Sequence, residues 1–296
     1  MTGGWNPFHR PDGTLRAGWW VLLWQAASVT LPFLTLPLAL LVLPRARLDA
    51  GGWEGVALLN VLLATALCLR IRQEGVPTVG LAWNRRWALE FGAGLLGGIL
   101  LMGGAALALR STGAFHWSRV PGSAAGPLLA GFGLYTLVAA LEELIYRGFA
   151  FQRLLEGLGP WPALLLGGAW FAWDHRSNPG MEDPMQRAWA LANIALAGLF
   201  LGLAYLRTRS LALPMGLHLG WNWMQGSVLG FAVSGTTDFM GPWRVVVDPA
   251  RAPWFHGGTF GLEASVFGTG ACLVAVVGLL AWRGSPSGGP STGGAR

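Results

Sequence analysis

Residues 141–150 read LEELIYRGFA, and they lie inside one of the most apolar parts of the chain. The segment PLLAGFGLYTLVAA (127–140) precedes them, and WPALLLGGAWFAW follows at 161–173. A charged side chain inside a membrane helix is costly and usually marks a function. Two adjacent glutamates and an arginine in such a run therefore predict a membrane helix that carries a functional site.

The composition places the chain among membrane proteins. Its 296 residues are 53% hydrophobic and only 11% charged, whereas a soluble domain typically has about 25% charged residues. All 20 basic residues are arginines, and the net charge of +6 is spread over many short loops. This distribution lacks the clustered basic patch that binds nucleic acid, so we expect no nucleic-acid partner.

Eight apolar runs approach the ~20 residues that a membrane helix needs. They are Trp19–Leu43, Trp53–Leu69, Phe91–Leu109, Leu128–Phe149, Trp161–His175, Trp189–Leu206, Leu211–Val233 and Ala264–Trp282. Backbone polar groups in lipid must be satisfied internally, so each run should be helical. We expect an all-α polytopic membrane protein, with about eight transmembrane helices in one bundle around an intramembrane polar cavity. The second and fifth runs are short, and Pro32 and Pro37 are expected to kink the first.

One domain is expected, with a polar N-terminal segment at 1–18 and a transmembrane bundle at 19–282 that carries polar motifs at 142–222. The tail, 283–296, is rich in Gly, Ser and Pro and is expected to be disordered. More loop arginines fall on the side of the N-terminus, which favours cytoplasmic termini. The composition is typical of a bacterial protein, so we expect it in the bacterial cytoplasmic membrane.

The first polar cluster is Glu142, Glu143 and Arg147. Glu143 and Arg147 are four residues apart, so they share a helical face and can pair. Glu142 points about 100° away, along the face of Tyr146, and has no local partner. An unpaired carboxylate in a low-dielectric site is the setting of a general acid or base. A purely structural ion-pair network is the alternative interpretation.

Two further clusters follow in later apolar runs. Phe171 and His175 are four residues apart in AWFAWDH, and His218 and Asn222 are four apart in GLHLGWNW. Structural alternatives exist for both: a solvated loop histidine at His175, and an interhelical hydrogen-bond pair at His218 and Asn222. The acidic residues near the second cluster are expected to face solvent in a loop: Asp174, Glu182 and Asp183.

A carboxylate base, a polarising histidine and neutral donors are the groups needed to add water to an amide carbonyl. Three of the four familiar intramembrane peptidase designs lack their residues here. No histidine is followed by glutamate, as the zinc motif His-Glu-x-x-His requires. The serine motif Gly-x-Ser-Gly does not occur, and every aspartate lies in a predicted loop or at the edge of a run. The design that combines glutamate with histidines is left.

The three clusters together resemble a known set of motifs. EE-x-x-x-R at 142–147, F-x-x-x-H at 171–175 and H-x-x-x-N at 218–222 are similar to the motifs of the CAAX protease and bacteriocin-processing (CPBP, or Abi) family. These intramembrane glutamic endopeptidases include the Rce1-type CAAX prenyl proteases. Order and gaps fit over about 100 residues, from Leu128 to Met224.

The resemblance implies a role for each motif residue. Glu142 and His175 would activate water, and His218 and Asn222 would stabilise the oxyanion. The remaining motif residues would support the site: Glu143, Arg147 and Phe171.

It also implies that Glu142 and His175 meet within the membrane. With both termini cytoplasmic, this requires the fourth helix to continue past Arg147 towards Arg153.

The activity implied by the resemblance is hydrolysis of a peptide bond without a cofactor. Two other interpretations stay open: a non-catalytic membrane immunity or regulatory protein of the same fold, and a zinc-dependent protease with Glu142, His175 and His218 as ligands. The expected partners are the lipid bilayer and a membrane-proximal peptide or protein substrate. The sequence indicates neither prenylation of that substrate nor an oligomeric state.

Overall fold

The computed structural model describes residues 6–42, 50–122, 124–238 and 240–284. Each of the eight predicted apolar runs contains a helix within these ranges. Parts of three predictions lie outside the described residues: 1–5 of the N-terminal segment, Leu43 at the end of the first run, and 285–296 of the predicted disordered tail.

The first apolar run forms two helices, α1 (Ala17–Thr30) and α2 (Pro32–Val42), separated at Leu31. Pro32 has no backbone N–H to donate, which accounts for the break. The kink predicted at Pro32 is thus confirmed. Pro37 lies inside α2, which continues past it.

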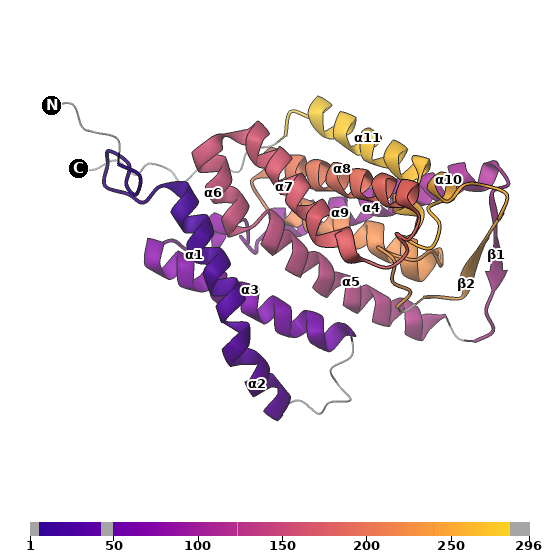
Figure 1. Ribbon diagram of the computed structural model, residues 1–296, viewed down its shortest axis with the longest axis horizontal. Helices are drawn as coiled ribbons and strands as arrows, with labels where there is room; N and C mark the ends of the chain where they lie inside the picture. Colours follow the sequence, from indigo (N-terminus) through magenta and orange to yellow (C-terminus); the bar gives the residue numbers. More distant parts are fainter. Residues whose placement is uncertain (1–5, 43–49, 123, 239, 285–296) are drawn as a thin grey trace.

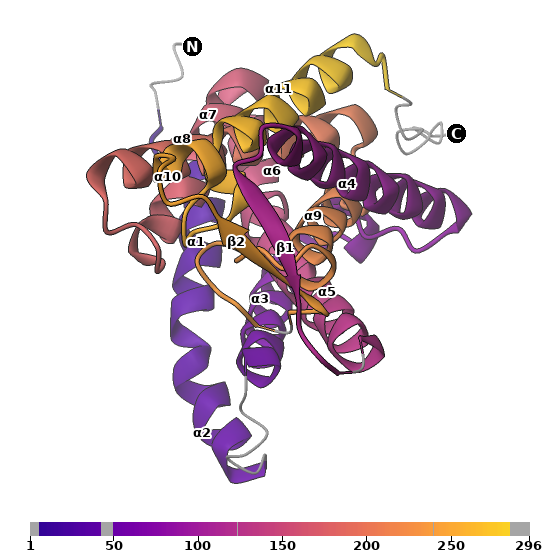
Figure 2. The ribbon, with the colours of Figure 1, turned by 90° about the vertical axis from the view of Figure 1, so that its right-hand side faces the viewer.

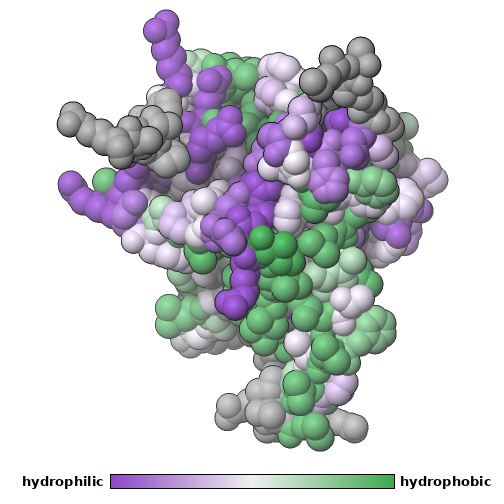
Figure 3. Space-filling view, turned by 90° about the vertical axis from the view of Figure 1, so that its left-hand side faces the viewer, coloured by the Kyte–Doolittle hydropathy of each residue, from purple (hydrophilic) through white to green (hydrophobic). Residues whose placement is uncertain are grey.

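Helices α1 and α2 form an arm that packs on α3 (Ala50–Arg72) and then projects from the rest of the molecule (Figure 1). Apolar side chains cover the projecting part, which is the lower part of Figure 3. Phe33 and Leu41 there are 77% and 82% exposed. Such a surface is unfavourable in water and matches a helix that faces lipid.

The other helices form a bundle beside this arm (Figure 1). They are α4 (Arg85–Ser111), α5 (Ala125–Tyr146), α6 (Phe149–Leu158), α7 (Pro160–Asp174), α8 (Pro184–Thr208), α9 (Ala212–Trp223), α10 (Pro253–His256) and α11 (Val266–Ala281). Short helical turns lie between them: η2 (Val76–Val79), η3 (His175–Ser177), η4 (Met224–Val228) and η5 (Leu262–Ala264).

Five helical stretches of the described chain are long and apolar enough to cross a membrane: Ala17–Leu41, Gly51–Arg72, Arg85–Ser111, Ala125–Leu158 and Pro184–Thr208. The predicted all-α polytopic membrane fold is confirmed. Helix α3, with 23 residues, is longer than the second apolar run suggested. Helices α7 and α9, with 15 and 12 residues, are shorter than a full span, so the count of eight transmembrane helices stays a prediction.

Helix α9 is the inner helix of the bundle. Every residue from Ala212 to Asn222 is buried, and α4, α5 and α8 all pack against it. The polar side chains of α9 are therefore surrounded by protein.

Glycines on both sides allow α4 and α9 to approach closely. A Cβ at Gly94 or Gly98 of α4 would collide with the carbonyl oxygen of Leu213 or Leu217 on α9. Equivalent contacts run the other way: Gly216 with Phe91, and Gly220 with Leu95. Close backbone packing of this kind is a common means of associating helices in lipid. It fixes the position of α9 and of the side chains that α9 carries.

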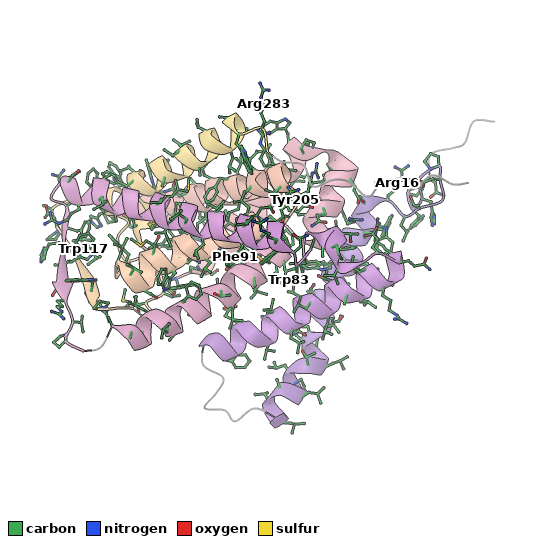
Figure 4. The ribbon with its side chains drawn as sticks, turned by 180° about the vertical axis from the view of Figure 1, so that it is seen from behind. Arg16, Trp83, Phe91, Trp117, Tyr205 and Arg283 are labelled. Carbon is green, nitrogen blue, oxygen red and sulfur yellow. The ribbon has the colours of Figure 1, made fainter. Side chains whose placement is uncertain are left out.

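A small antiparallel sheet adds to the helices. Strands β1 (Phe115–Arg119) and β2 (Trp243–Val247) pair across one end of the bundle (Figure 2). Trp117 marks this end, and Arg16 lies at the opposite end (Figure 4). The indole of Trp117 donates to the carbonyl of Leu229 over 2.9 Å, which anchors the loop that leaves η4.

The glycine interface gives a testable prediction. Gly98→Ala should lower the stability of the protein by about 1–3 kcal/mol, because the new methyl group must push α9 away. Gly104→Ala on the same helix should instead be neutral or stabilising, since its Cβ would meet open space and alanine favours a helix over glycine by ~1 kcal/mol. Thermal unfolding of both variants in one detergent measures the difference. Equal shifts for the two would contradict the close contact.

Candidate active site

The glutamate–arginine pair at the end of α5 is buried. Glu143 is 0% and Arg147 is 1% exposed, and Arg147 Nη1 donates to Glu143 Oε1 over 2.9 Å. Arg147 Nη2 donates to the carbonyl of Gly198 on α8 over 3.0 Å. The guanidinium carbon lies 4.9 Å from the ring centre of Phe171. A buried charge without a partner is strongly destabilising, so these contacts explain how the arginine is accommodated, and the predicted pair is confirmed.

His218 of α9 connects the two glutamates. Its Nδ1 lies 2.8 Å from Glu143 Oε1, and its Nε2 lies 3.6 Å from Glu142 Oε2. Because Arg147 holds Glu143 as an acceptor, the proton of this bond belongs to Nδ1. Glu142, without a local partner in the sequence, thus meets a side chain from another helix.

Helix α5 ends at Tyr146, before a break at Gly148 from which α6 starts. A Cβ at Gly148 would collide with the carbonyl oxygen of Leu144, so the turn requires glycine. The fourth helical stretch does continue past Arg147 towards Arg153, as expected, but with a break at Gly148 between α5 and α6. The chain stays helical on both sides of the break.

The second motif places His175 at the end of α7. His175 Nδ1 lies 2.8 Å from the carbonyl oxygen of Phe171. A carbonyl only accepts, so Nδ1 carries the proton and Nε2 of the neutral ring is an acceptor. The ring of Phe171 packs edge-on against His175 and His218, with centroid distances of 4.6 and 6.2 Å.

Asn222 lies one turn after His218 on α9 and is 7% exposed. Among the described residues its carboxamide forms no hydrogen bond. A buried amide is usually hydrogen-bonded, so its donors are available to a ligand.

A cavity of about 350 Å³ brings the motif residues together. Five of them line it: Glu142, Phe171, His175, His218 and Asn222. Glu143 and Arg147 do not line it and contact the lining residues from behind. The four predicted catalytic residues thus line the cavity together with Phe171, which was predicted to support the site, and the role of each residue stays a prediction.

Several polar residues of the cavity wall were missed by the sequence analysis: Glu54, Asn178, Asn193, Ser234, Asp238 and Glu263. They come from segments far apart in the chain, so no local spacing connects them. Glu54 and Asn193 had a signal, because each is a polar residue within an apolar run.

Asp174 was expected to face solvent in a loop; it is exposed, as expected, but it lies at the end of a helix rather than in a loop. It is the last residue of α7, accepts a hydrogen bond from the Tyr146 hydroxyl over 2.7 Å and lines the cavity. Tyr146 lies one turn after Glu142, and both side chains line the same cavity.

Glu263 on η5 closes another side of the cavity. The backbone N–H and the hydroxyl of Ser234 both donate to its Oε1, the hydroxyl over 2.9 Å. Burial raises the pKa of Glu263, although the hydrogen bonds from Ser234 act in the opposite direction. Ser234 has φ +49°, which is uncommon for a residue other than glycine. The two hydrogen bonds hold this strained residue beside the cavity.

The part of the chain that contains the three motifs matches a known protein family. Residues 124–224 match the family model described as type II CAAX prenyl endopeptidase Rce1-like. This segment, about a third of the chain, is similar to the Rce1-like family. The Rce1-like segment contains all three motifs and confirms the Rce1-type resemblance, whereas Glu54, Asp238 and Glu263 lie outside it. No curated protein and no solved structure matches the chain.

The two adjacent glutamates should differ in their effect on stability. Glu143→Gln should destabilise the protein by about 3 kcal/mol or more, because it leaves the Arg147 charge buried without a counter-ion. Glu142→Gln should change stability by less than about 1 kcal/mol, since the Glu142 side chain is 22% exposed to the cavity. Unfolding midpoints of both variants in detergent test this. A larger loss for Glu142→Gln would contradict the assignment of Glu143 as the structural carboxylate.

Proposed function

We propose that this protein is an intramembrane endopeptidase that hydrolyses a peptide bond with water activated by glutamate and histidine. Its Rce1-like segment is similar to a protease family, and its apolar helices suit an integral membrane protein. One observation carries the proposal: His218 is held between Glu143 and Glu142 at a cavity that His175 and Asn222 also line.

Glu142 and His175 are proposed to activate the water. Glu142 offers carboxylate oxygens to the cavity, and the neutral ring of His175 offers Nε2 as a second acceptor. The water oxygen bonds to the carbonyl carbon of the substrate while its proton passes to Glu142. The C–N bond then breaks as the leaving amine takes up that proton, so the immediate products are a carboxylic acid and an amine, which ionise to a carboxylate and an ammonium group.

His218 and Asn222 are proposed to stabilise the oxyanion of the tetrahedral intermediate. When His218 is protonated, Nδ1 donates to Glu143 and Nε2 is free to donate towards the cavity. Glu143 thus holds the imidazole in a fixed orientation, as the buried carboxylate of a catalytic triad does. The carboxamide of Asn222 supplies a second donor from the same face of α9.

The proposed substrate is a peptide or protein segment close to the membrane. We further propose that both termini face the cytoplasm of a bacterial cell, on the basis of the arginine distribution. Reporter fusions at the two ends test the orientation, and a reporter active only outside the cytoplasm would contradict it.

Catalysis by Glu142 gives a direct prediction. Glu142→Gln should lower cleavage by at least about 10²-fold, because the amide cannot accept the proton of water. His218→Ala should cause a loss of about 10²–10³-fold by removing an oxyanion donor. The peptides in the membranes of cells that express the wild type, Glu142→Ala or one of these variants at matched levels are compared. Peptides that appear only with active protein are the cleavage products. Full activity of Glu142→Gln would refute the mechanism, and a complete lack of Glu142-dependent products would favour the non-catalytic interpretation.

Metal analysis separates the zinc-dependent interpretation. Within the described ranges, no three His, Cys, Asp or Glu side chains are grouped to hold a metal ion. We expect purified active protein to contain less than stoichiometric zinc and to keep its activity after chelation. Stoichiometric zinc together with loss of activity on chelation would instead assign Glu142, His175 and His218 as metal ligands.

A further inference from the structure

The cavity wall has an unusual charge distribution. Among the described residues, five acidic side chains line it and no arginine does. The acids are Glu54, Glu142, Asp174, Asp238 and Glu263. If Glu263 is counted as neutral, four carboxylates still face two histidines. The wall is therefore acidic although the chain carries a net charge of +6.

Two of these carboxylates have no partner in the part of the chain that the structure describes. Glu54 of α3 and Asp238 of the loop before β2 form no hydrogen bond or ion pair among the described residues. Glu54 lies on a helix long and apolar enough to span a membrane, where an unpaired charge is costly and marks a binding or catalytic function. It also lies close enough to Glu142 for their charges to act on each other, and this repulsion would be relieved by a cation between them.

A second cavity, at the start of α4 and the end of α8, has a different charge distribution. It has a volume of about 640 Å³ and is lined by three acids and three arginines. Its carboxylates are neutralised within the protein: Glu74 pairs with Arg72 at 2.6 Å, Glu90 with Arg86 at 2.7 Å and Glu156 with Arg153 at 2.8 Å. The acidic side chains of this second cavity are thus each paired with an arginine, whereas no arginine among the described residues lines the motif cavity.

The motif cavity also contains a buried hydroxyl group, that of Tyr135, that is available to a ligand. Tyr135 is 3% exposed, lines the cavity, and its hydroxyl has no hydrogen-bond partner among the described residues. Asp238 and Glu263 lie close enough for their charges to act on this hydroxyl. A buried hydroxyl without a partner costs about 1–3 kcal/mol, and its oxygen can accept a hydrogen bond from an N–H donor.

We propose that the cavity selects a peptide segment with a basic side chain beside the bond to be cleaved, held by Glu54 and Asp238 with the Tyr135 hydroxyl as a further acceptor. This inference rests on the proposed function and specifies its substrate class. A CAAX sequence ends in the free carboxylate of its own chain. An acidic cavity wall without arginine repels such a terminus, so the chain is better suited to cleavage within a basic, membrane-proximal segment.

Binding of matched peptides tests the inference without requiring cleavage. Three peptides share an apolar N-terminal anchor and an amidated C-terminus, and they carry Arg, Gln or Glu at one central position. A fourth peptide carries Gln at this position and ends three residues later in a free carboxylate. Fluorescence anisotropy with the full-length protein in neutral detergent gives each Kd. The Arg peptide should bind about tenfold more tightly than the Gln peptide, and the Glu and free-acid peptides more weakly than Gln. Non-specific attraction to a protein of net charge +6 would give the opposite order.

Matched variants identify the residues responsible. Glu54→Gln and Asp238→Asn should each reduce the preference for the Arg peptide by about threefold or more. Glu182→Gln, an exposed acid that does not line the cavity, should leave the preference unchanged.

Equal affinity for the Arg, Gln and Glu peptides, or no measurable binding of any, would overturn the inference. So would a preference that survives both cavity variants. Cleavage of the same peptides by wild type and Glu142→Gln is recorded separately. A charge preference without Glu142-dependent cleavage would therefore refute the proposed function and leave cation recognition standing.

Discussion

A single carboxylate, that of Glu143, links the three helices on which the site is built. It accepts hydrogen bonds from Arg147 at the end of α5 and from His218 on α9, and Arg147 in turn binds the carbonyl of Gly198 on α8. Each ion in this buried network would be strongly destabilising without the others. The network therefore requires α5, α8 and α9 to meet in one arrangement, which places Glu142 and His218 side by side at the cavity.

The different positions of the two adjacent glutamates follow from helical geometry. Successive residues point about 100° apart, so Glu143 faces the protein interior while Glu142 faces the cavity. Burial makes Glu143 an orienting group for His218, and exposure to the cavity leaves Glu142 free to contact water and substrate. The close glycine interface of α4 and α9 supports this arrangement from the other side, because it fixes the helix that carries His218 and Asn222.

The sequence predicted the helical membrane fold and the motif residues, because both depend on local patterns. Apolar runs determine helices in lipid, and a spacing of four residues places Glu143 with Arg147 and Phe171 with His175. The break at Gly148 depends on one backbone turn that hydrophobicity does not reveal. Glu54, Asp238 and Glu263 reach the cavity only through tertiary packing. They also lie outside the Rce1-like segment. These three acidic residues of the cavity therefore come from parts of the chain that the motifs do not include.

A double-mutant cycle between Glu143 and His218 tests the central interaction most directly. Unfolding free energies are measured in one detergent for the wild type, Glu143→Gln, His218→Gln and the double variant. Residues that share a buried hydrogen bond typically show a coupling of about 0.5–3 kcal/mol, and we predict a value above about 1 kcal/mol here. Additive effects of the two substitutions would show that Glu143 does not hold His218, and would contradict the account of the site.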